Sequence, residues 1–395
     1  MKPLEGIRIL DFSRVLAGPM ATQILAEMGA EVTKVERQGT GDESRSFEPR
    51  VAGGESAYFL AFNRGKRSLT LNLKSPKGQE LARRLAAESD VVLENFLPGE
   101  MERFGLGYDR LAGLNPGLIY VSSTGFGQTG PYRNRPGYDT VFQALSGLMH
   151  LTGHADGPPA KAGIPVADMS SGLWIAIAIL SGLVGKARHG KGCRVDLSMM
   201  DVQASLLALA AARLFALDED VTRAGTEHPG RVPSAAFECC DGGWLHISGS
   251  DQHWPALVTA LGLAELAADS GLDKNAGRVA DRERVMAAMR SAILRHDRAP
   301  LAEQLRAAGI PAGEVNTVRE ILSDPHMQAR GVVGAFEHPS AGRFPALRTP
   351  VRFEGFDDPE IGCPPRLGAD TERILSEELG LGAAEIETLK TEGVV

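Results

Sequence analysis

Short runs of β-branched and aliphatic residues alternate with longer amphipathic stretches in the first third of the chain. Five runs of strand type occupy residues 7–10, 31–36, 67–73, 90–94 and 118–122. Helix-start signals follow two of them, since Pro19 comes after the first run and Ser75 with Pro76 comes after the third. Repeated strand–helix–strand crossovers predict a doubly wound, mainly parallel sheet with helices on both faces. We therefore expect an α/β fold with a Rossmann-like large domain.

The pattern changes in the second half of the chain. Residues 168–187 and 198–217 have the character of two long helices, and a His-Pro-Gly-Arg-Val-Pro segment at 228–233 then breaks the pattern. A strand at 244–248 and helices rich in Ala, Leu and Arg follow. We predict a large domain over residues 1–225, a smaller α/β domain over 226–332 and a C-terminal segment over 333–395 that returns to the large domain.

Composition limits the possible partners. The formal net charge is -8, and acidic and basic side chains are mixed along the chain, which argues against a nucleic-acid-binding surface. The longest apolar run, 172–184, has about 13 residues where a membrane-spanning helix needs about 20, so we expect a buried core helix and no membrane partner. The N-terminus lacks signal-peptide features and the four cysteines lack the C-x-x-C spacing of zinc or redox sites, which predicts a cytoplasmic protein with reduced thiols.

The loops that leave the carboxyl ends of the strands carry the candidate ligand chemistry. The turn after the first strand contains Ala17-Gly18-Pro19 in place of G-x-G-x-x-G, which argues against dinucleotide binding. The histidines are scattered without H-x-x-H or H-E-x-x-H spacing, so no metal is expected. Two basic clusters, one around Arg37 and Arg45 and one at residues 63–67, together suit an anionic nucleotide better than either does alone.

Asp168 directly precedes the apolar helix. Its spacing favours the N-cap position, where a carboxylate accepts hydrogen bonds from free backbone N–H groups. The same N–H groups and the helix dipole would lower the pKa of Asp168 and could stabilise an oxyanion on a neighbouring carbonyl group. An N-cap and a nucleophile are compatible geometries, and the spacing alone leaves both open.

Several separated blocks of residues together resemble the class III CoA-transferase family, also called the CaiB/BaiF family. The blocks are Gly6–Phe12 with Ala17-Gly18-Pro19; Glu36-Arg37 with Gly41-Asp42 and Arg45; Asn63–Ser68; Glu94-Asn95-Phe96 with Pro98-Gly99; Asp168 with Ser171-Gly172; Gly309-Ile310-Pro311; Asp324-Pro325 with Ala329-Arg330-Gly331; and Leu367-Gly368. No single block is specific, but their order and spacing along nearly the whole chain are.

The resemblance implies an interlocked homodimer, in which two subunits thread through each other. It also implies that Asp168 is the catalytic residue, which attacks a donor acyl-CoA and then carries CoA as an aspartyl thioester until a carboxylic acid accepts it. Coenzyme A is then a substrate, and no permanently bound cofactor is implied. By position, the CoA-binding residues implied are Val15, Ala17, Arg37, Leu71, Leu73, Asn95, Phe96, Arg103 and Arg135.

Two departures from the family pattern bear on the substrate pocket. Leu16 stands where formyl-CoA transferases have glutamine, which argues against oxalate and formyl-CoA as substrates. Tyr138 stands where the racemase branch has its histidine, and a phenol is too weak an acid to replace histidine easily in α-proton exchange. We therefore predict CoA transfer from a donor such as succinyl-CoA to a small di- or hydroxycarboxylic acid. A 2-methylacyl-CoA racemase and a non-catalytic acyl-CoA-binding protein are the alternatives.

Overall fold

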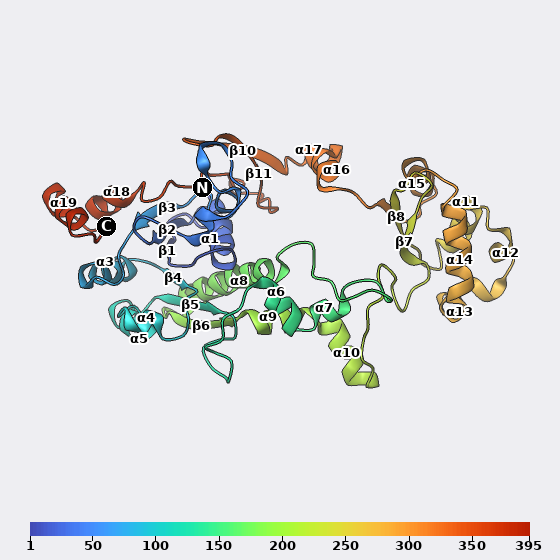
Figure 1. The fold of residues 1–395 in the computed structure, drawn as a ribbon, viewed down its shortest axis with the longest axis horizontal. Helices are drawn as coiled ribbons and strands as arrows, with labels where there is room; N and C mark the ends of the chain where they lie inside the picture. Colours follow the sequence, from blue (N-terminus) through green and yellow to red (C-terminus); the bar gives the residue numbers. More distant parts are fainter. The chain divides into compact units, whose positions relative to one another are not determined.

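The computed structural model describes all 395 residues, which form two compact units (Figure 1). The large unit comprises residues 1–148, 161–218 and 325–395, and the second unit comprises 149–160 and 219–324. The divisions predicted after residues 225 and 332 each fall a few residues later than these. The prediction did not assign residues 149–160 to the second unit, although Gly157-Pro158-Pro159 is a turn signal within them.

Six parallel strands form the sheet of the large unit, in the order β3-β2-β1-β4-β5-β6. They are β1 (Arg8–Asp11), β2 (Glu31–Glu36), β3 (Arg67–Thr70), β4 (Val91–Glu94), β5 (Ile119–Thr124) and β6 (Cys193–Ser198). The predicted parallel sheet is confirmed, and five of its strands lie where the strand-type runs predicted them. The sequence analysis missed β6, because Arg194 and Asp196 alternate with apolar residues in this edge strand and no long apolar run marks it.

The helices of the large unit connect the strands of this sheet or follow its last strand, β6, along the chain. They are α1 (Ala17–Glu27), α2 (Ala57–Phe62), α3 (Pro76–Ala87), α4 (Glu100–Arg103), α5 (Tyr108–Leu114), α6 (Asp139–Leu145), α8 (Val166–His189), α9 (Met199–Leu206), α10 (Ala208–Leu217), α17 (Pro325–Ala329), α18 (Thr371–Glu377) and α19 (Ala383–Thr391), with 3₁₀ turns η1 (Glu43–Ser46) and η2 (Ala52–Gly54). A separate antiparallel hairpin pairs β10 (Val333–His338) with β11 (Gly342–Leu347).

Successive residues of the buried strands point to opposite faces of the sheet, so each strand contributes to two cores. Ile9 and Val91 pack on the face covered by α1 and α8, as Figure 1 shows for the ribbons. Leu10 and Val92 pack on the other face with residues of α3, α5, α18 and α19. Burial on both faces explains why these strands are apolar along their length.

The second unit has its own core and its own sheet. Its elements are the antiparallel strands β7 (Ser234–Glu238), β8 (Trp244–Ser248) and β9 (Ala312–Glu314), the helices α11 (Trp254–Ala260), α12 (Ala264–Ala267), α13 (Asn275–Ala280), α14 (Arg282–Ile293), α15 (Arg298–Ala307) and α16 (Val318–Ser323), and the turn η3 (Ser270–Leu272). The chain passes from the large unit to the second unit within helix α7 (Leu148–Leu151), after Leu148. The fully buried Arg278 ties this unit together, since it donates to Val232 O and to Asp251 Oδ1 at 2.7 Å each.

Helix α8 extends beyond the predicted span at both ends, and only one side of it is buried. Ile175 and Ile179 are fully buried, whereas Leu173 and Ile177 are 50% and 48% exposed. The prediction of a buried core helix is therefore only partly correct for the single chain. By length and composition alone α8 could cross a membrane, as could α9 and α10 taken as one span bent by 64°. One or two such helices are weak evidence for a membrane span, because the core helix of a soluble protein passes the same test of length and composition.

Two glycines allow α1 to pack closely against its neighbours. A Cβ atom on Gly172 of α8 would lie 2.9 Å from the Ala17 carbonyl oxygen, and one on Gly18 would lie 2.3 Å from the Ser13 side chain. Asp168 precedes Gly172 by four residues and lies on the same side of α8. The contact therefore brings Asp168 toward the first turn of α1.

We predict that Gly172→Ala destabilises the protein, because the added methyl group would force α8 away from the backbone of α1. Overpacking of this kind typically costs about 1–3 kcal/mol of unfolding free energy. Gly185→Ala in the same helix is the matched control, since nothing lies within 4 Å of the added Cβ, and it should stabilise by up to about 1 kcal/mol through helix propensity. Denaturant unfolding followed by circular dichroism measures both changes. Equal stabilities of the two variants would contradict the close contact.

Candidate active site

The loops after β1 and β4 meet at the point where the strand order of the sheet reverses direction. Asn95 joins them, because its Oδ1 accepts a hydrogen bond from Arg14 N at 3.0 Å and its Nδ2 donates to Arg14 O at 2.9 Å. The Arg14 guanidinium group stacks over Phe96, 4.6 Å from the ring centroid. The predicted residues Asn95 and Phe96 thus lie where open α/β sheets bind their ligands.

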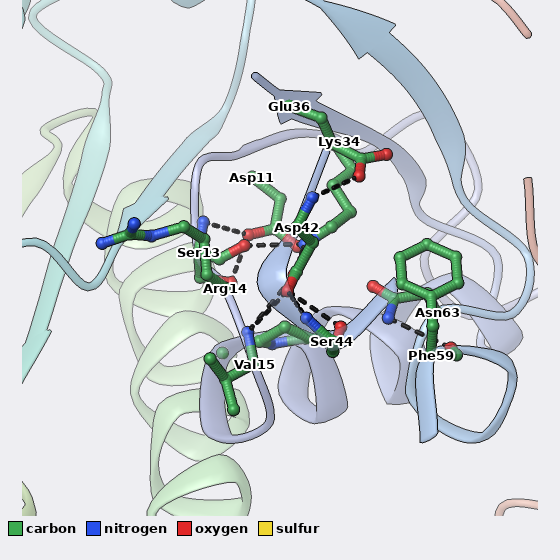
Figure 2. A network of polar contacts seen from close by, with 12 residues as sticks. Asp11, Ser13, Arg14, Val15, Lys34, Glu36, Asp42, Ser44, Phe59 and Asn63 are labelled. Carbon is green, nitrogen blue, oxygen red and sulfur yellow. Dashed lines mark hydrogen bonds and ion pairs between the residues drawn. The ribbon is translucent and has the colours of Figure 1, made fainter. Parts of the chain in front are cut away.

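The loop after β1 has an unusual backbone at Val15, whose φ of 71° lies in the left-handed region that β-branched residues rarely adopt. Asp42 holds this conformation, since both of its carboxylate oxygens accept from Val15 N at 3.2 Å. Asp42 also accepts from Ser44 N and Oγ, each at 2.8 Å. Figure 2 shows Asp42 at the centre of these contacts, with Lys34 Nζ 2.8 Å from Asp42 Oδ2.

Two buried ion pairs lie beneath this loop. Lys34 pairs with Asp42, and Lys66 Nζ lies 3.3 Å from Asp11 Oδ2, with all four side chains at most 1% exposed. Lys34 Nζ also donates to Ser13 O at 2.7 Å. Burial lowers the pKa of Lys66 to about 7, although the charge of Asp11 opposes this shift. Removing one partner of a buried pair leaves an uncompensated charge, so these pairs fix the loop firmly.

Asp168 is not the N-cap residue of α8, contrary to the prediction from spacing. The helix begins at Val166, and the preceding Pro165 provides no side-chain cap. Asp139, the first residue of α6, supplies the cap from another helix. Its Oδ1 accepts from Ala167 N at 2.7 Å and from Asp168 N at 3.2 Å.

The pKa of Asp168 is raised to about 7, which is opposite to the expected direction. Burial is the larger cause, and the negative charge of Asp139 adds to it. The first N–H groups of α8 do not reach the Asp168 carboxylate, because Asp139 accepts from Ala167 N and Asp168 N and Pro165 O accepts from Met169 N at 2.9 Å. The predicted oxyanion site at these N–H groups is therefore also wrong.

Other predicted residues follow β1, β2 and β3. Arg37 comes directly after β2 and is exposed, and Leu73 after β3 is partly buried. Leu16, Ala17 and Leu71 are only 1%, 6% and 2% exposed. A ligand at this edge of the sheet would meet these three residues mainly through their backbone.

The remaining predicted residues follow β4 and β5. Arg103, at the end of α4, is exposed and pairs with Glu100 at 3.0 Å. Arg135 stacks over the ring of Tyr132, 3.7 Å from its centroid. Tyr138 is 73% exposed and directly precedes the capping residue Asp139. All predicted residues outside α8 thus lie in segments that leave the carboxyl ends of strands. Tyr138 is also adjacent in sequence to Asp139, which caps the start of α8.

The sequence analysis did not single out Tyr58, on α2. Burial raises the pKa of its hydroxyl group, and the negative charges of Asp168, Asp139 and Asp42 raise it further. Its ring packs edge-on against two phenylalanine rings, with centroids 5.4 Å away in each case. The surrounding sequence, Ser-Ala-Tyr-Phe-Leu-Ala-Phe, carries only the signal of a short apolar helix.

Comparisons with known proteins agree with this geometry. The profile described as CoA-transferase family III matches residues 4–371. The chain belongs to CoA-transferase family III. Succinyl-CoA:glutarate CoA-transferase of Mus musculus is 39% identical over 100% of this chain and 91% of the mouse protein. Succinate–glutarate CoA-transferase of Agrobacterium fabrum is 38% identical over 95% of each protein.

The fold of this CoA-transferase also has close solved neighbours. A CaiB/BaiF family protein from Brucella suis is 40% identical and superimposes with a TM-score of 0.86, covering 95% of this chain and 99% of that chain. The resemblance inferred from the separated sequence blocks is thus confirmed over nearly the full length, and so is the prediction of an enzyme.

We expect Asp42→Asn to destabilise this CoA-transferase by up to about 3–5 kcal/mol, because the change removes the direct ion-pair partner of the buried Lys34 and leaves it only the weaker influence of Asp11 and Glu36. The neighbouring Glu43→Gln is the matched control. Its carboxylate is 55% exposed and forms only a surface ion pair with Arg14 at 3.2 Å, so its loss should cost less than about 1 kcal/mol. Denaturant unfolding compares the two variants. A similar small cost for both would show that the Lys34 pair does not hold the loop.

Asp168→Asn is expected to stabilise the enzyme at alkaline pH. The folded pKa of Asp168 is raised from 3.8 to about 7, so the wild type loses stability as the pH rises through this interval. Removing the charge should raise Tm by about 2–4 °C at pH 8 and by less at pH 5, after allowance for the partial exposure of the side chain. Thermal unfolding of both proteins at the two pH values tests this. A Tm difference independent of pH would contradict the raised pKa.

Proposed function

We propose that this CoA-transferase moves CoA from succinyl-CoA to a small dicarboxylic acid through an aspartyl-CoA thioester on Asp168. The observation that carries the proposal is that the partly buried Asp168 carboxylate has neither a cation nor a hydrogen-bond donor beside it. A carboxylate without such partners keeps its electron density available for attack on a carbonyl carbon. The names of the mouse and Agrobacterium relatives support succinyl-CoA as donor and a dicarboxylate as acceptor.

The proposed reaction needs no water, redox step or nucleotide hydrolysis. A carboxylate oxygen of Asp168 attacks the thioester carbon of the donor, a C–O bond forms, and the C–S bond breaks to release CoA thiolate. The thiolate then attacks the aspartyl carbonyl carbon of the mixed anhydride, which releases the donor acid and leaves the thioester on Asp168. The acceptor carboxylate repeats the two steps in reverse and restores the Asp168 carboxylate.

We assign the binding of CoA to the loops after β1, β2, β3 and β4. Arg37 and Arg103 suit its phosphate groups, because both guanidinium groups are exposed and Arg103 has only a surface ion pair to exchange. Val15 and Asn95 would border the pantetheine chain from a loop that buried ion pairs keep rigid. A rigid cradle reduces the ordering cost of binding and helps to position the thioester for attack.

We also propose that the enzyme is an interlocked homodimer. Large apolar side chains are exposed on α8 and α10 of the single chain, including Trp174 at 46%, Leu209 at 75% and Phe215 at 84%. Apolar surface of this extent is typical of a subunit interface. Light scattering coupled to gel filtration should give twice the 42.0 kDa mass of one chain at micromolar concentration. A monomer at that concentration would contradict the proposal.

The role of Asp168 is tested by substitution and by trapping. Asp168→Ala and Asp168→Asn should lower transfer by roughly 10³-fold or more, because no other residue can carry the CoA. Wild-type enzyme incubated with succinyl-CoA and then treated with hydroxylamine should give a modified Asp168 peptide by mass spectrometry. Asp109→Asn, an exposed carboxylate in the first turn of α5, is the control that should keep activity and label. Turnover without label on Asp168, or activity in Asp168→Asn, would refute the mechanism.

A racemase or a non-catalytic binding protein is less well supported. The relatives described above are named as CoA-transferases, and Tyr138 offers a weak acid where a racemase needs a histidine.

A further inference from the structure

The proposed reaction uses Asp168 but gives no role to the carboxylate that caps its helix. Pro165, before the helix, has φ −74° and ψ 70° and no side chain that could accept hydrogen bonds. Asp139 therefore takes two N–H groups that would otherwise lack an acceptor, and one of them belongs to Asp168 itself. The backbone of the nucleophile is thus bonded directly to a residue of α6.

Two glutamines hold this arrangement in place. Gln143, fully buried one turn along α6, donates from Nε2 to Asp139 Oδ2 at 2.6 Å and accepts from Ala162 N at 2.9 Å. Gln203, fully buried on α9, donates to Ser170 Oγ at 2.8 Å, two residues after Asp168 on α8. All of the hydrogen-bond partners of Asp139 are uncharged N–H groups. Its negative charge consequently has no cation to balance it, apart from the positive end of the α8 dipole.

We propose that Asp139 is a positioning residue for CoA transfer, which fixes the start of α8 and keeps a second negative charge beside the nucleophile. The inference rests on the proposed function of Asp168. Formation of the anhydride or thioester removes the charge of Asp168, whereas the charge of Asp139 stays. The repulsion between the two carboxylates exists in the free enzyme and disappears in the covalent intermediates, so it favours attack on the donor.

The other charged or titratable groups around Asp168 do not share this role. Tyr58 faces it from α2, but its phenol stays neutral because burial and the nearby carboxylates raise its pKa. Burial and the charge of Asp139 are the causes of the raised Asp168 pKa. The elements packed against α8 otherwise carry Glu27 of α1, Tyr120 of β5, Cys193, Arg194 and Asp196 of β6, and Asp201 of α9. The basic residues of α8 itself lie in its last turn, at the opposite end from Asp168.

A pH profile separates the charge of Asp139 from its capping role. Asp139→Asn keeps an oxygen for the helix N–H groups but removes the charge, so the acidic limb of kcat/KM should move roughly one unit toward lower pH. Asp139→Ala also removes the cap and should lower kcat by roughly a further 10-fold. Asp109→Asn is the matched control, since it removes an exposed carboxylate elsewhere, and its kcat/KM should keep the acidic limb of the wild type. An unchanged limb in a folded Asp139→Asn enzyme would overturn the inference.

Asp139→Ser is a second neutral cap, because a hydroxyl oxygen can accept from both the helix and Gln143. It avoids the opposed N–H groups that asparagine would place against the Gln143 amide. The same shift of the acidic limb is expected for Asp139→Ser, so the proposal stays testable where the asparagine variant folds poorly.

A double-mutant cycle followed by thermal unfolding measures the interaction between the charges of Asp139 and Asp168 without an activity assay. The gain in Tm at pH 8 from Asp168→Asn should fall by roughly a third in the Asp139→Asn or Asp139→Ser background, because burial remains the larger cause of the raised Asp168 pKa. An undiminished gain would overturn the role of Asp139 even where Asp168→Asn is inactive. Retained turnover in Asp168→Asn would instead refute the proposed function of Asp168, so the two failures are distinguishable.

Discussion

The arrangement of the active site depends on one steric constraint, the close approach of α8 to the first turn of α1. Gly172 meets the backbone of Ala17 at a distance that leaves no room for a side chain. Both helices begin at the carboxyl edge of the sheet, because each leads into the amino end of a parallel strand. The contact therefore joins the helix that carries Asp168 to the loop proposed to hold CoA, although the two are more than a hundred residues apart in sequence.

Buried carboxylates are paired with lysines near α1 but have no cation beside them at the start of α8. Under the loop after β1, Lys34 and Lys66 pair with Asp42 and Asp11, and these pairs hold the left-handed backbone of Val15 in place. At the start of α8 no cation accompanies Asp168. The ion pairs thus keep the loop proposed to bind CoA rigid. The absence of a cation beside Asp168 leaves its carboxylate reactive for the proposed attack on the thioester.

The strands and the helix starts could be predicted because they depend on residues that are adjacent in the sequence. The buried strands were found because their apolar runs are continuous, whereas β6 was missed because an edge strand is apolar on only one face. The position of Asp168 at the start of a long helix was found, but its pKa direction was wrong. The reason is that Asp139, from a segment distant in sequence, accepts the hydrogen bonds of the first N–H groups of that helix. The residues around Asp168 give no sign of such a partner. Tyr58 was missed for the same reason.

The large unit is assembled from segments that precede and follow the second unit in the sequence, which has a consequence for synthesis on the ribosome. Residues of α18 and α19 complete the core on one face of the large sheet, where Ile374 and Leu389 are buried and Asn72 N donates to Val394 O at 2.8 Å. These residues are translated after the whole of the second unit. The second unit can therefore fold first, while one face of the nascent sheet, covered only by residues of the earlier helices such as α3 and α5, stays partly exposed and needs protection from aggregation until translation has passed α19.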